Sequence, residues 1–138
     1  MKLAPANAAA TREGRMDRLR RERAGSLAMR AAYPAVLQLR IELKFASSDP
    51  NTPTPQAHVL YPPARAFFSY PCPHANCDGH FDLTAAVRGA IEGEAPIAQG
   101  MLECGGSRAR DHGSKQLCLL QLHYGVSATY EPRGKLRD

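Results

Sequence analysis

Alternation of apolar and polar residues marks two long segments of this chain. From Ala35 to Phe45 every second residue is apolar, and the residues between them are mostly polar or charged. The same alternation runs from Cys118 to Tyr130, where one of the two faces is entirely apolar. Because side chains alternate between the two faces of a strand, each segment is predicted to form a half-buried β-strand.

Two shorter strands are predicted between the long ones. One is Ala64–Tyr70, which is rich in apolar and aromatic residues, and the other is Gln99–Cys104. Pro62 and Pro63 precede the first of them, and a proline cannot donate a hydrogen bond to a sheet. We therefore expect the two prolines to lie outside the strand.

One short amphipathic helix is predicted after the second cysteine. Apolar residues from Leu83 to Ile91 recur at spacings of three and four, which is the helical period. Asp82 is placed to cap the first turn, and Gly93 and Pro96 are typical of the end of a helix. The pattern as a whole predicts an α+β or mainly β fold, with about four antiparallel strands and one short helix.

The first thirty-two residues differ in composition from the rest. They hold eight basic residues against three acidic ones, whereas residues 33–138 hold ten of each, so this arm carries the whole formal net charge of +5. Its apolar residues form only a ragged stripe, and Gly25 interrupts it. We predict a basic arm over 1–32 that is a marginal helix or disordered, one domain over 33–131, and a tail over 132–138.

Length and hydropathy place the chain in the class of small intracellular proteins. It has 138 residues, 43% of them hydrophobic, which suits a single domain. No apolar run approaches the roughly 20 residues that span a bilayer, and the start lacks the apolar stretch of a secretory signal. We expect a cytoplasmic protein without membrane contact. An Arg-rich and Ala-rich start also suits an organelle transit peptide, although three acidic residues count against it.

Four cysteines supply the candidate chemistry. Cys72, Cys77, Cys104 and Cys118 are spaced C-x4-C-x26-C-x13-C. In a reducing compartment such a set more often binds a metal than forms disulfides, and tetrahedral zinc takes four sulfur or nitrogen ligands. We predict one structural Zn²⁺ held by the four cysteines, which ties the strand ends together.

Two alternatives to this ligand set stay open. Cys104 and Cys118 also lie in register with apolar faces, and free cysteine is among the most buried residue types, so both suit a plain core position. If Cys118 is only a core residue, the fourth ligand is one of His74, His80 and His112.

The segment Tyr70-Pro-Cys72-Pro-His-Ala-Asn-Cys77-Asp-Gly79 resembles the knuckle of zinc-ribbon proteins, and Cys104-Gly105-Gly106 resembles the start of a second knuckle. The resemblance covers residues 70–118. It implies that a strand ends at the first cysteine and that the glycine after the second lets backbone amides point at the sulfurs. The spacing departs from the usual two residues between knuckle cysteines, since four stand here and thirteen separate the second pair.

The sequence offers little support for an enzyme. It contains no G-x-x-x-x-G-K-[ST], G-x-G-x-x-G or G-x-S-x-G motif, and none of the cysteine runs of ferredoxins. A catalytic zinc needs an open coordination position beside a general base. The carboxylates near the cysteines are Asp78, Asp82 and Glu103, and Asp82 is already explained as a helix cap.

Basic residues of the arm and of the glycine-rich segment 105–115 are the candidate nucleic-acid contacts. They are Arg12, Arg15, Arg18, Arg20, Arg21, Arg23, Arg108, Arg110 and Lys115. Basic groups bind phosphates, although a segment such as 105–115 is more often a solvated connection. Four aromatic residues near the first knuckle are better explained by packing than by base stacking; they are Phe67, Phe68, Tyr70 and Phe81.

Two functional hypotheses follow from these features. The first is a small non-enzymatic zinc protein that is associated with nucleic acid or has a regulatory role. The alternative is a protein–protein interaction module or accessory subunit without nucleic-acid binding, whose arm folds against a partner.

Overall fold

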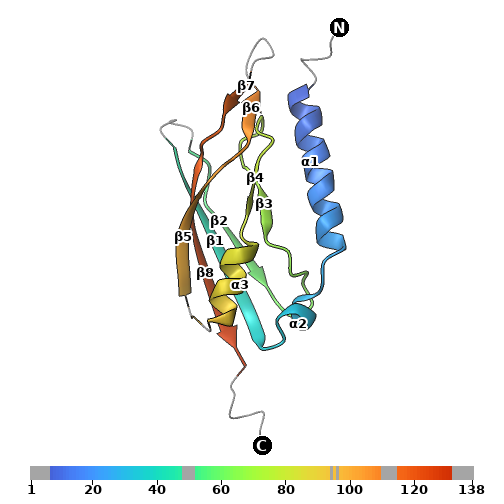
Figure 1. Ribbon diagram of the computed structural model, residues 1–138, viewed down its shortest axis with the longest axis vertical. Helices are drawn as coiled ribbons and strands as arrows, with labels where there is room; N and C mark the ends of the chain where they lie inside the picture. Colours follow the sequence, from blue (N-terminus) through green and yellow to red (C-terminus); the bar gives the residue numbers. More distant parts are fainter. Residues whose placement is uncertain (1–6, 48–51, 94, 96, 110–114, 132–138) are drawn as a thin grey trace, which may run out of the picture.

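A four-stranded antiparallel sheet forms the largest part of the protein, in the order β2-β1-β8-β5 (Figure 1). The computed structural model describes residues 7–47, 52–93, 95, 97–109 and 115–131. The predicted fold class, with about four antiparallel strands and more strand than helix, is confirmed. The sheet strands are β1 (Val36–Ala46), β2 (Gln56–Leu60), β5 (Ile97–Glu103) and β8 (Gln121–Tyr130).

One face of this sheet is covered by a second layer. The layer contains the hairpin of β3 (Ser69–Pro71) and β4 (His80–Asp82), followed by α3 (Thr84–Glu92) (Figure 1). Leu39, Ile41 and Leu43 of β1 are at most 1% exposed on the covered face. Burying a Leu or Ile side chain stabilises a fold by about 1.5–3 kcal/mol, so the strand alternation drives the two layers together.

The predicted helix is confirmed as α3. The N-cap is Leu83, one residue after the expected Asp82, and it makes no side-chain cap hydrogen bond; the carboxylate of Asp82 accepts hydrogen bonds from the Thr84 amide at 3.0 Å and the Thr84 hydroxyl at 2.6 Å. Val87 and Ala90 face the core. The helix ends at Gly93, whose amide bonds to the Gly89 carbonyl, and Pro96 lies outside the described residues.

Two further helices precede the sheet. The first, α1 (Asn7–Ala24), runs along the second layer, and Leu19 of its inner face is 4% exposed (Figure 1). The chain then turns at Gly25 into the short α2 (Met29–Ala32), where Met29 belongs to the hydrophobic core. The segment 1–32 therefore contains residues that pack against the body of the protein.

The predicted strand Ala64–Tyr70 is wrong for most of its length. Only its last two residues enter β3, because the backbone before them bonds to the segment around α2. The amide of Met29 donates to the Ala64 carbonyl and the amide of Ala66 to the Leu27 carbonyl, both at 2.7 Å. The fourth sheet strand is instead β2, which the sequence did not predict. Pro62 and Pro63 lie outside it, as expected.

The two long strands lie where the sequence predicts them, but each differs from the prediction at its N-terminal end. In β1 the register shifts between Val36 and Gln38, so Val36 is buried and Leu37 is 41% exposed, the reverse of the expected alternation. The last strand begins at Gln121 rather than Cys118. Leu119 interrupts it with a φ of 56°, a left-handed conformation that non-glycine residues rarely adopt.

The segment between the last two cysteines carries a hairpin where a loop was expected. Its arms are β6 (Ser107–Ala109) and β7 (Lys115–Leu117), paired antiparallel, and residues 110–114 are not described. A bridge between Cys77 and Arg108 joins the hairpin to the first cysteine pair. The cysteine-bearing end of the molecule is therefore built from three short backbone segments side by side.

Candidate metal centre

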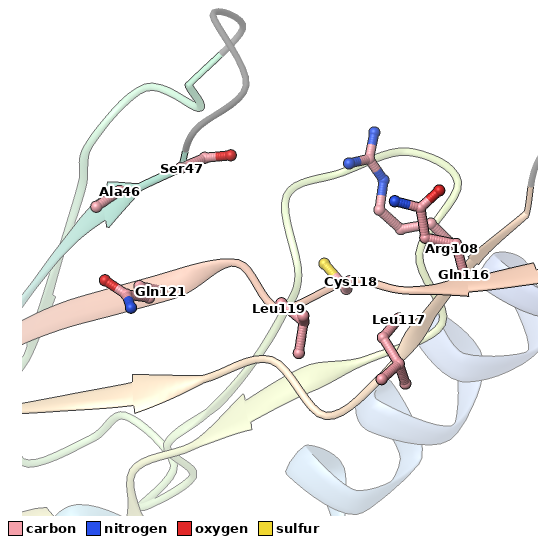
Figure 2. A pocket seen from close by; sticks show the side chains of 8 residues that line it. All are labelled: Ala46, Ser47, Arg108, Gln116, Leu117, Cys118, Leu119 and Gln121. Atoms are coloured by element: carbon pink, nitrogen blue, oxygen red, sulfur yellow. The ribbon is translucent and has the colours of Figure 1, made fainter.

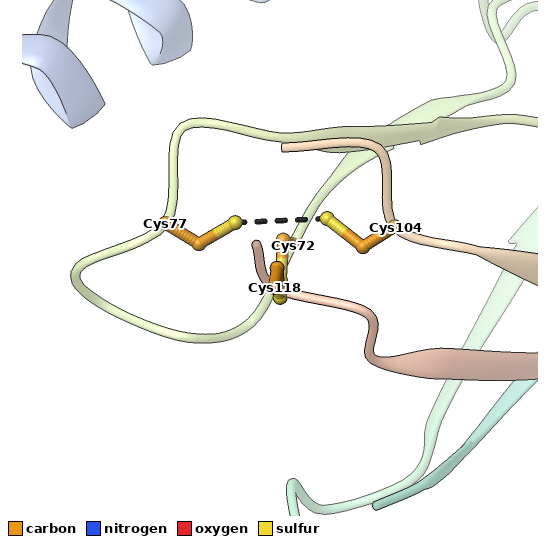
Figure 3. Close-up of side chains that lie close together, drawn as sticks. All are labelled: Cys72, Cys77, Cys104 and Cys118. Atoms are coloured by element: carbon orange, nitrogen blue, oxygen red, sulfur yellow. Dashed lines mark hydrogen bonds between the residues drawn. The ribbon is translucent and has the colours of Figure 1, made fainter. Parts of the chain in front are cut away.

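Four cysteine side chains converge where the sheet meets the second layer (Figure 3). Cys72 follows β3, Cys77 lies in the loop before β4, Cys104 follows β5, and Cys118 lies between β7 and β8. Their sulfur atoms all lie within 4.8 Å of one another, and none is in a disulfide. The structure thus brings together the four residues that the sequence proposed as ligands.

The spacing of the sulfurs matches what a tetrahedral ion requires. Cys77 Sγ lies 3.6 Å from Cys104 Sγ, and Cys72 Sγ lies 3.7 Å from Cys118 Sγ. Four thiolates at the Zn–S distance of about 2.3 Å stand about 3.8 Å apart along each edge of the tetrahedron. Both distances are far longer than the roughly 2.05 Å of a disulfide bond. The cluster could therefore hold one metal ion.

Two backbone turns aim amide groups at the sulfurs. The Gly79 amide donates to Cys77 Sγ at 3.3 Å, and the Gly106 amide donates to Cys104 Sγ at 3.4 Å. Each amide lies two residues after its cysteine. Hydrogen bonds of this kind stabilise negative charge on sulfur, which a metal thiolate carries.

The same two glycines bond to the remaining two cysteines. The Cys72 amide donates to the Gly79 carbonyl and the Cys118 amide donates to the Gly106 carbonyl, each at 3.0 Å. Each half of the centre thus repeats one hydrogen-bond pattern, although the cysteines of the first half are five positions apart and those of the second are fourteen. The pattern explains how unequal sequence spacing produces two equivalent halves.

Gly79 and Gly106 stand back to back at the centre. A Cβ on Gly106 would lie 2.4 Å from the Cα of Gly79, and a Cβ on Gly79 would lie 2.5 Å from Cys104 Sγ. Real Cβ atoms do not approach other atoms so closely. Asp78 reinforces the contact, since its carboxylate accepts a hydrogen bond from the Ser107 amide at 2.7 Å. Only glycine fits at these two positions.

The close packing of the thiols shifts their pKa values in opposite directions. Hydrogen bonds with Cys104 and Cys72 lower the pKa of the Cys77 thiol to about 2. Hydrogen bonds with Cys104 and Cys77, followed by burial, raise the pKa of Cys72. A divalent ion at the centre would offset the charge of several thiolates.

The described histidines lie outside the sulfur cluster. Among the described residues the sulfur cluster includes no histidine, while His74 lies half-buried in the first knuckle and His80 is exposed on β4. His112, the other alternative ligand, lies outside the described residues. His58 is half-buried, with its ring stacked on Tyr70 at a centroid distance of 4.3 Å, and His123 is exposed.

A pocket of about 620 Å³ lies beside the centre and reaches one of the four sulfurs (Figure 2). Cys118 lines this pocket and is half-buried, whereas the other three cysteines are at most 1% exposed. Among the described lining residues, Arg108 is the charged one. The other lining residues are Ala46, Ser47, Gln116, Leu117, Leu119 and Gln121.

The basic residues proposed for nucleic-acid contact have diverse surroundings. Arg15 is only 4% exposed, so its side chain is not a surface group. Arg18 pairs with Glu22 at 3.9 Å and Arg20 pairs with Asp17, all four on the exposed face of α1. Arg21 and Arg23 are also exposed.

The remaining members of that set lie on the hairpin or outside the described side chains. Arg108 is half-buried, and its Nε donates to Asn76 Oδ1 at 3.3 Å. Arg110 lies outside the described residues. Arg12 belongs to α1 and Lys115 to β7, but their side chains are not described.

A second pocket, of about 400 Å³, combines cations with aromatic rings in a way the sequence did not indicate. Two arginines line it, Arg23 of α1 and Arg65. The aromatic side chains in its wall are Phe67, Tyr70 and, from the edge strand β2, His58. The Arg23 guanidinium lies 5.1 Å from the centroid of the Phe67 ring. Burial, and then the charge of Arg23, lower the pKa of His58. These groups are far apart in sequence, so no local pattern reveals them.

Comparison with known proteins gives no family assignment: no protein-family model, curated protein or solved structure matches this chain. Within the described part of the chain, no helix is both long enough and apolar enough to cross a membrane.

Proposed function

We propose that this protein is a non-enzymatic zinc-binding protein whose single structural Zn²⁺ is held by Cys72, Cys77, Cys104 and Cys118. The observation that carries the proposal is the pair of sulfur–sulfur distances of 3.6 and 3.7 Å, close to the tetrahedral edge of a zinc–thiolate site. Tetrahedral sites with four sulfur ligands are typical of zinc and iron. The two amide-to-sulfur turns support the zinc-ribbon-like description of both halves.

A structural rather than catalytic role suits the centre because all four coordination positions have a protein ligand. Structural zinc sites are closed in this way, whereas catalytic sites keep a position for water or substrate. Asp78, one of the two carboxylates adjacent in sequence to a cysteine, is engaged with the Ser107 amide. The metal would join the β3–β4 hairpin to the ends of the sheet strands β5 and β8.

The test is to determine the metal and its geometry in the full chain. Native mass spectrometry is expected to find one zinc per chain, and replacement by Co²⁺ should give the absorption bands of tetrahedral cobalt with thiolate ligands. Cys77→Ser should abolish stoichiometric binding, whereas Ser69→Ala, a small buried residue outside the cluster, should retain it. A folded protein with two disulfides and no metal would contradict the proposal.

Nucleic-acid binding is the second candidate function, and the pocket around Arg23 and Arg65 favours it. Two guanidinium groups stand beside aromatic side chains, and none of the described residues that line the pocket is acidic. Cations that follow a backbone and rings that stack on bases are the usual means of binding single-stranded nucleic acid.

Binding of a labelled single-stranded oligonucleotide, measured by anisotropy at several salt concentrations, tests this candidate. Replacing both Arg23 and Arg65 with Ala should weaken binding and reduce the slope of log K against log salt by about 0.7 per lost phosphate contact on a single strand. Arg88→Ala on the exposed face of α3 is the matched control. If the wild-type protein shows no binding at low salt, the protein-interaction hypothesis replaces this one.

A further inference from the structure

We propose that Cys118 is an oxidation site, whose thiolate is oxidised by a small hydroperoxide and then forms a disulfide with Cys72. The inference rests on the proposed zinc centre and concerns which of its four sulfurs reacts. Cys118 differs from the other three cysteines in access, in hydrogen bonding and in backbone conformation.

Access distinguishes Cys118 most clearly. Cys72, Cys77 and Cys104 are 0%, 1% and 1% exposed, whereas Cys118 is half-buried and lines the pocket of about 620 Å³. In Figure 2 the sulfur of Cys118 and the guanidinium of Arg108 point toward the same opening. A hydroperoxide needs much less room than this pocket offers, and Arg108 in the pocket wall would stabilise negative charge on the departing hydroxide.

Hydrogen bonding leaves Cys118 the least stabilised sulfur. Backbone amides donate to Cys77 from Gly79, to Cys104 from Gly106 and to Cys72 from His74. Among the described residues, no backbone amide donates to Cys118 Sγ. Because each such bond withdraws charge from a thiolate, the sulfur without one keeps the greatest nucleophilicity.

The backbone beside Cys118 is strained. Leu119 has a φ of 56° and its side chain is 51% exposed. A left-handed conformation is unfavourable for a non-glycine residue, and this strain would be released if the segment changed conformation after the metal leaves. The strain therefore favours departure of Cys118 from the centre over departure of a ligand with relaxed surroundings.

The reaction has two balanced steps. The Cys118 thiolate attacks one oxygen of hydrogen peroxide, the O–O bond breaks, a sulfenic acid forms and hydroxide leaves. The Cys72 thiolate, 3.7 Å away, then attacks the sulfenic sulfur, the S–S bond forms and a second hydroxide leaves. Two electrons pass from the two sulfurs to the peroxide. Loss of two thiolate ligands releases the metal ion.

The second pair of neighbouring sulfurs serves as an internal control for the effect of access. Cys77 and Cys104 lie at almost the same separation, 3.6 Å, but both are fully buried. If proximity alone decided the product, the two pairs would oxidise equally. If access decides it, the disulfide between Cys72 and Cys118 forms first and the other pair remains reduced.

The experiment treats the metal-loaded full chain with hydrogen peroxide, blocks free thiols with N-ethylmaleimide under denaturing conditions, and maps the peptides by mass spectrometry. The expected result is a Cys72–Cys118 link that appears together with metal release, while Cys77 and Cys104 carry the maleimide. Equal or faster formation of the Cys77–Cys104 link would overturn the proposal, as would a random mixture of links.

A pair of variants tests access separately from metal binding. Gln121→Trp places a large ring in the wall of the pocket and should slow the oxidation of Cys118 several-fold without changing the metal content. Gln99→Trp makes the same change at an exposed position of β5 outside the pocket and should have no effect. Equal oxidation rates in both variants would refute the role of the pocket. If the protein carries no metal, the zinc proposal fails, while the disulfide map still decides which cysteine reacts first.

Discussion

Adding one methyl group at Gly106 should disrupt the metal centre, whereas the same addition at the neighbouring Gly105 should have little effect. A Cβ on Gly106 would lie 2.4 Å from both the Cα and the amide nitrogen of Gly79, and 2.8 Å from Asp78 Oδ1. Two of these contacts are with backbone atoms, which cannot rotate away as a side chain can. A Cβ on Gly105 meets nothing within 4 Å.

The cost of Gly106→Ala has two parts. Overpacking of a well-filled site costs about 1–3 kcal/mol. If the turn moves to relieve the contact, the Gly106 amide leaves Cys104 Sγ and the Gly106 carbonyl leaves the Cys118 amide, and each net hydrogen bond is worth about 1 kcal/mol. We expect Gly106→Ala to lower the free energy of unfolding by about 2–4 kcal/mol, and Gly105→Ala to change it by less than about 0.5 kcal/mol.

Urea unfolding of the metal-loaded variants, with chelator competition in parallel, measures both effects. Gly106→Ala should shift the urea midpoint downward and release its metal at a lower chelator concentration than the wild type. Gly105→Ala should match the wild type in both measurements. If the two variants behave alike, the close contact between the two turns does not hold the centre together, and the argument from the glycines is wrong.

Three further predictions follow from the described contacts. Leu19→Ala should lower the free energy of unfolding by about 2 kcal/mol or more because this residue is 4% exposed, whereas Leu27→Ala, at 63% exposure, should have little effect in the same urea assay. Burial raises the pKa of Tyr70 to about 12, so the folded state favours the neutral phenol. The free energy of unfolding should therefore fall as the pH rises from about 10 to 12. Tyr70→Phe should flatten this fall, whereas Tyr61→Phe, at a residue that is 54% exposed, should leave it unchanged. A strong chelator should unfold the protein, since structural zinc contributes on the order of 10 kcal/mol to small domains, and circular dichroism that is unchanged after complete metal removal would refute this.

The long strands and the cysteine set could be predicted because their signals are local or compositional. Alternation over eleven residues identifies β1 without knowledge of its neighbours. The glycines after Cys77 and Cys104 mark turns, which the structure uses to aim amides at sulfur. The sequence did not indicate which cysteines approach most closely, because the near pairs join residues that are 27 and 46 positions apart.

The missed elements depend on tertiary contacts. β2 lacks an alternating apolar pattern because one of its inward positions is His58, whose ring finds a partner in Tyr70 only after folding. Ala64–Phe68 has strand-forming composition, yet its backbone bonds to the segment around α2 instead of to a sheet neighbour. Local propensity does not encode such choices, since they depend on which backbone groups lie nearby.

Two of the four cysteines belong to the sheet layer and two belong to the second layer. Cys104 and Cys118 extend the sheet strands β5 and β8, and the Cys104 amide still bonds across to the Leu120 carbonyl at 2.8 Å. Cys72 and Cys77 belong to the β3–β4 layer.

The two closest sulfur pairs, Cys72 with Cys118 and Cys77 with Cys104, both cross from one layer to the other. A metal bound to all four would therefore link the two layers at the cysteine-bearing end of the hydrophobic core. Each half of the centre has its own turn and its own amide-to-sulfur bond, so the ion joins two parts that are separately ordered by the backbone.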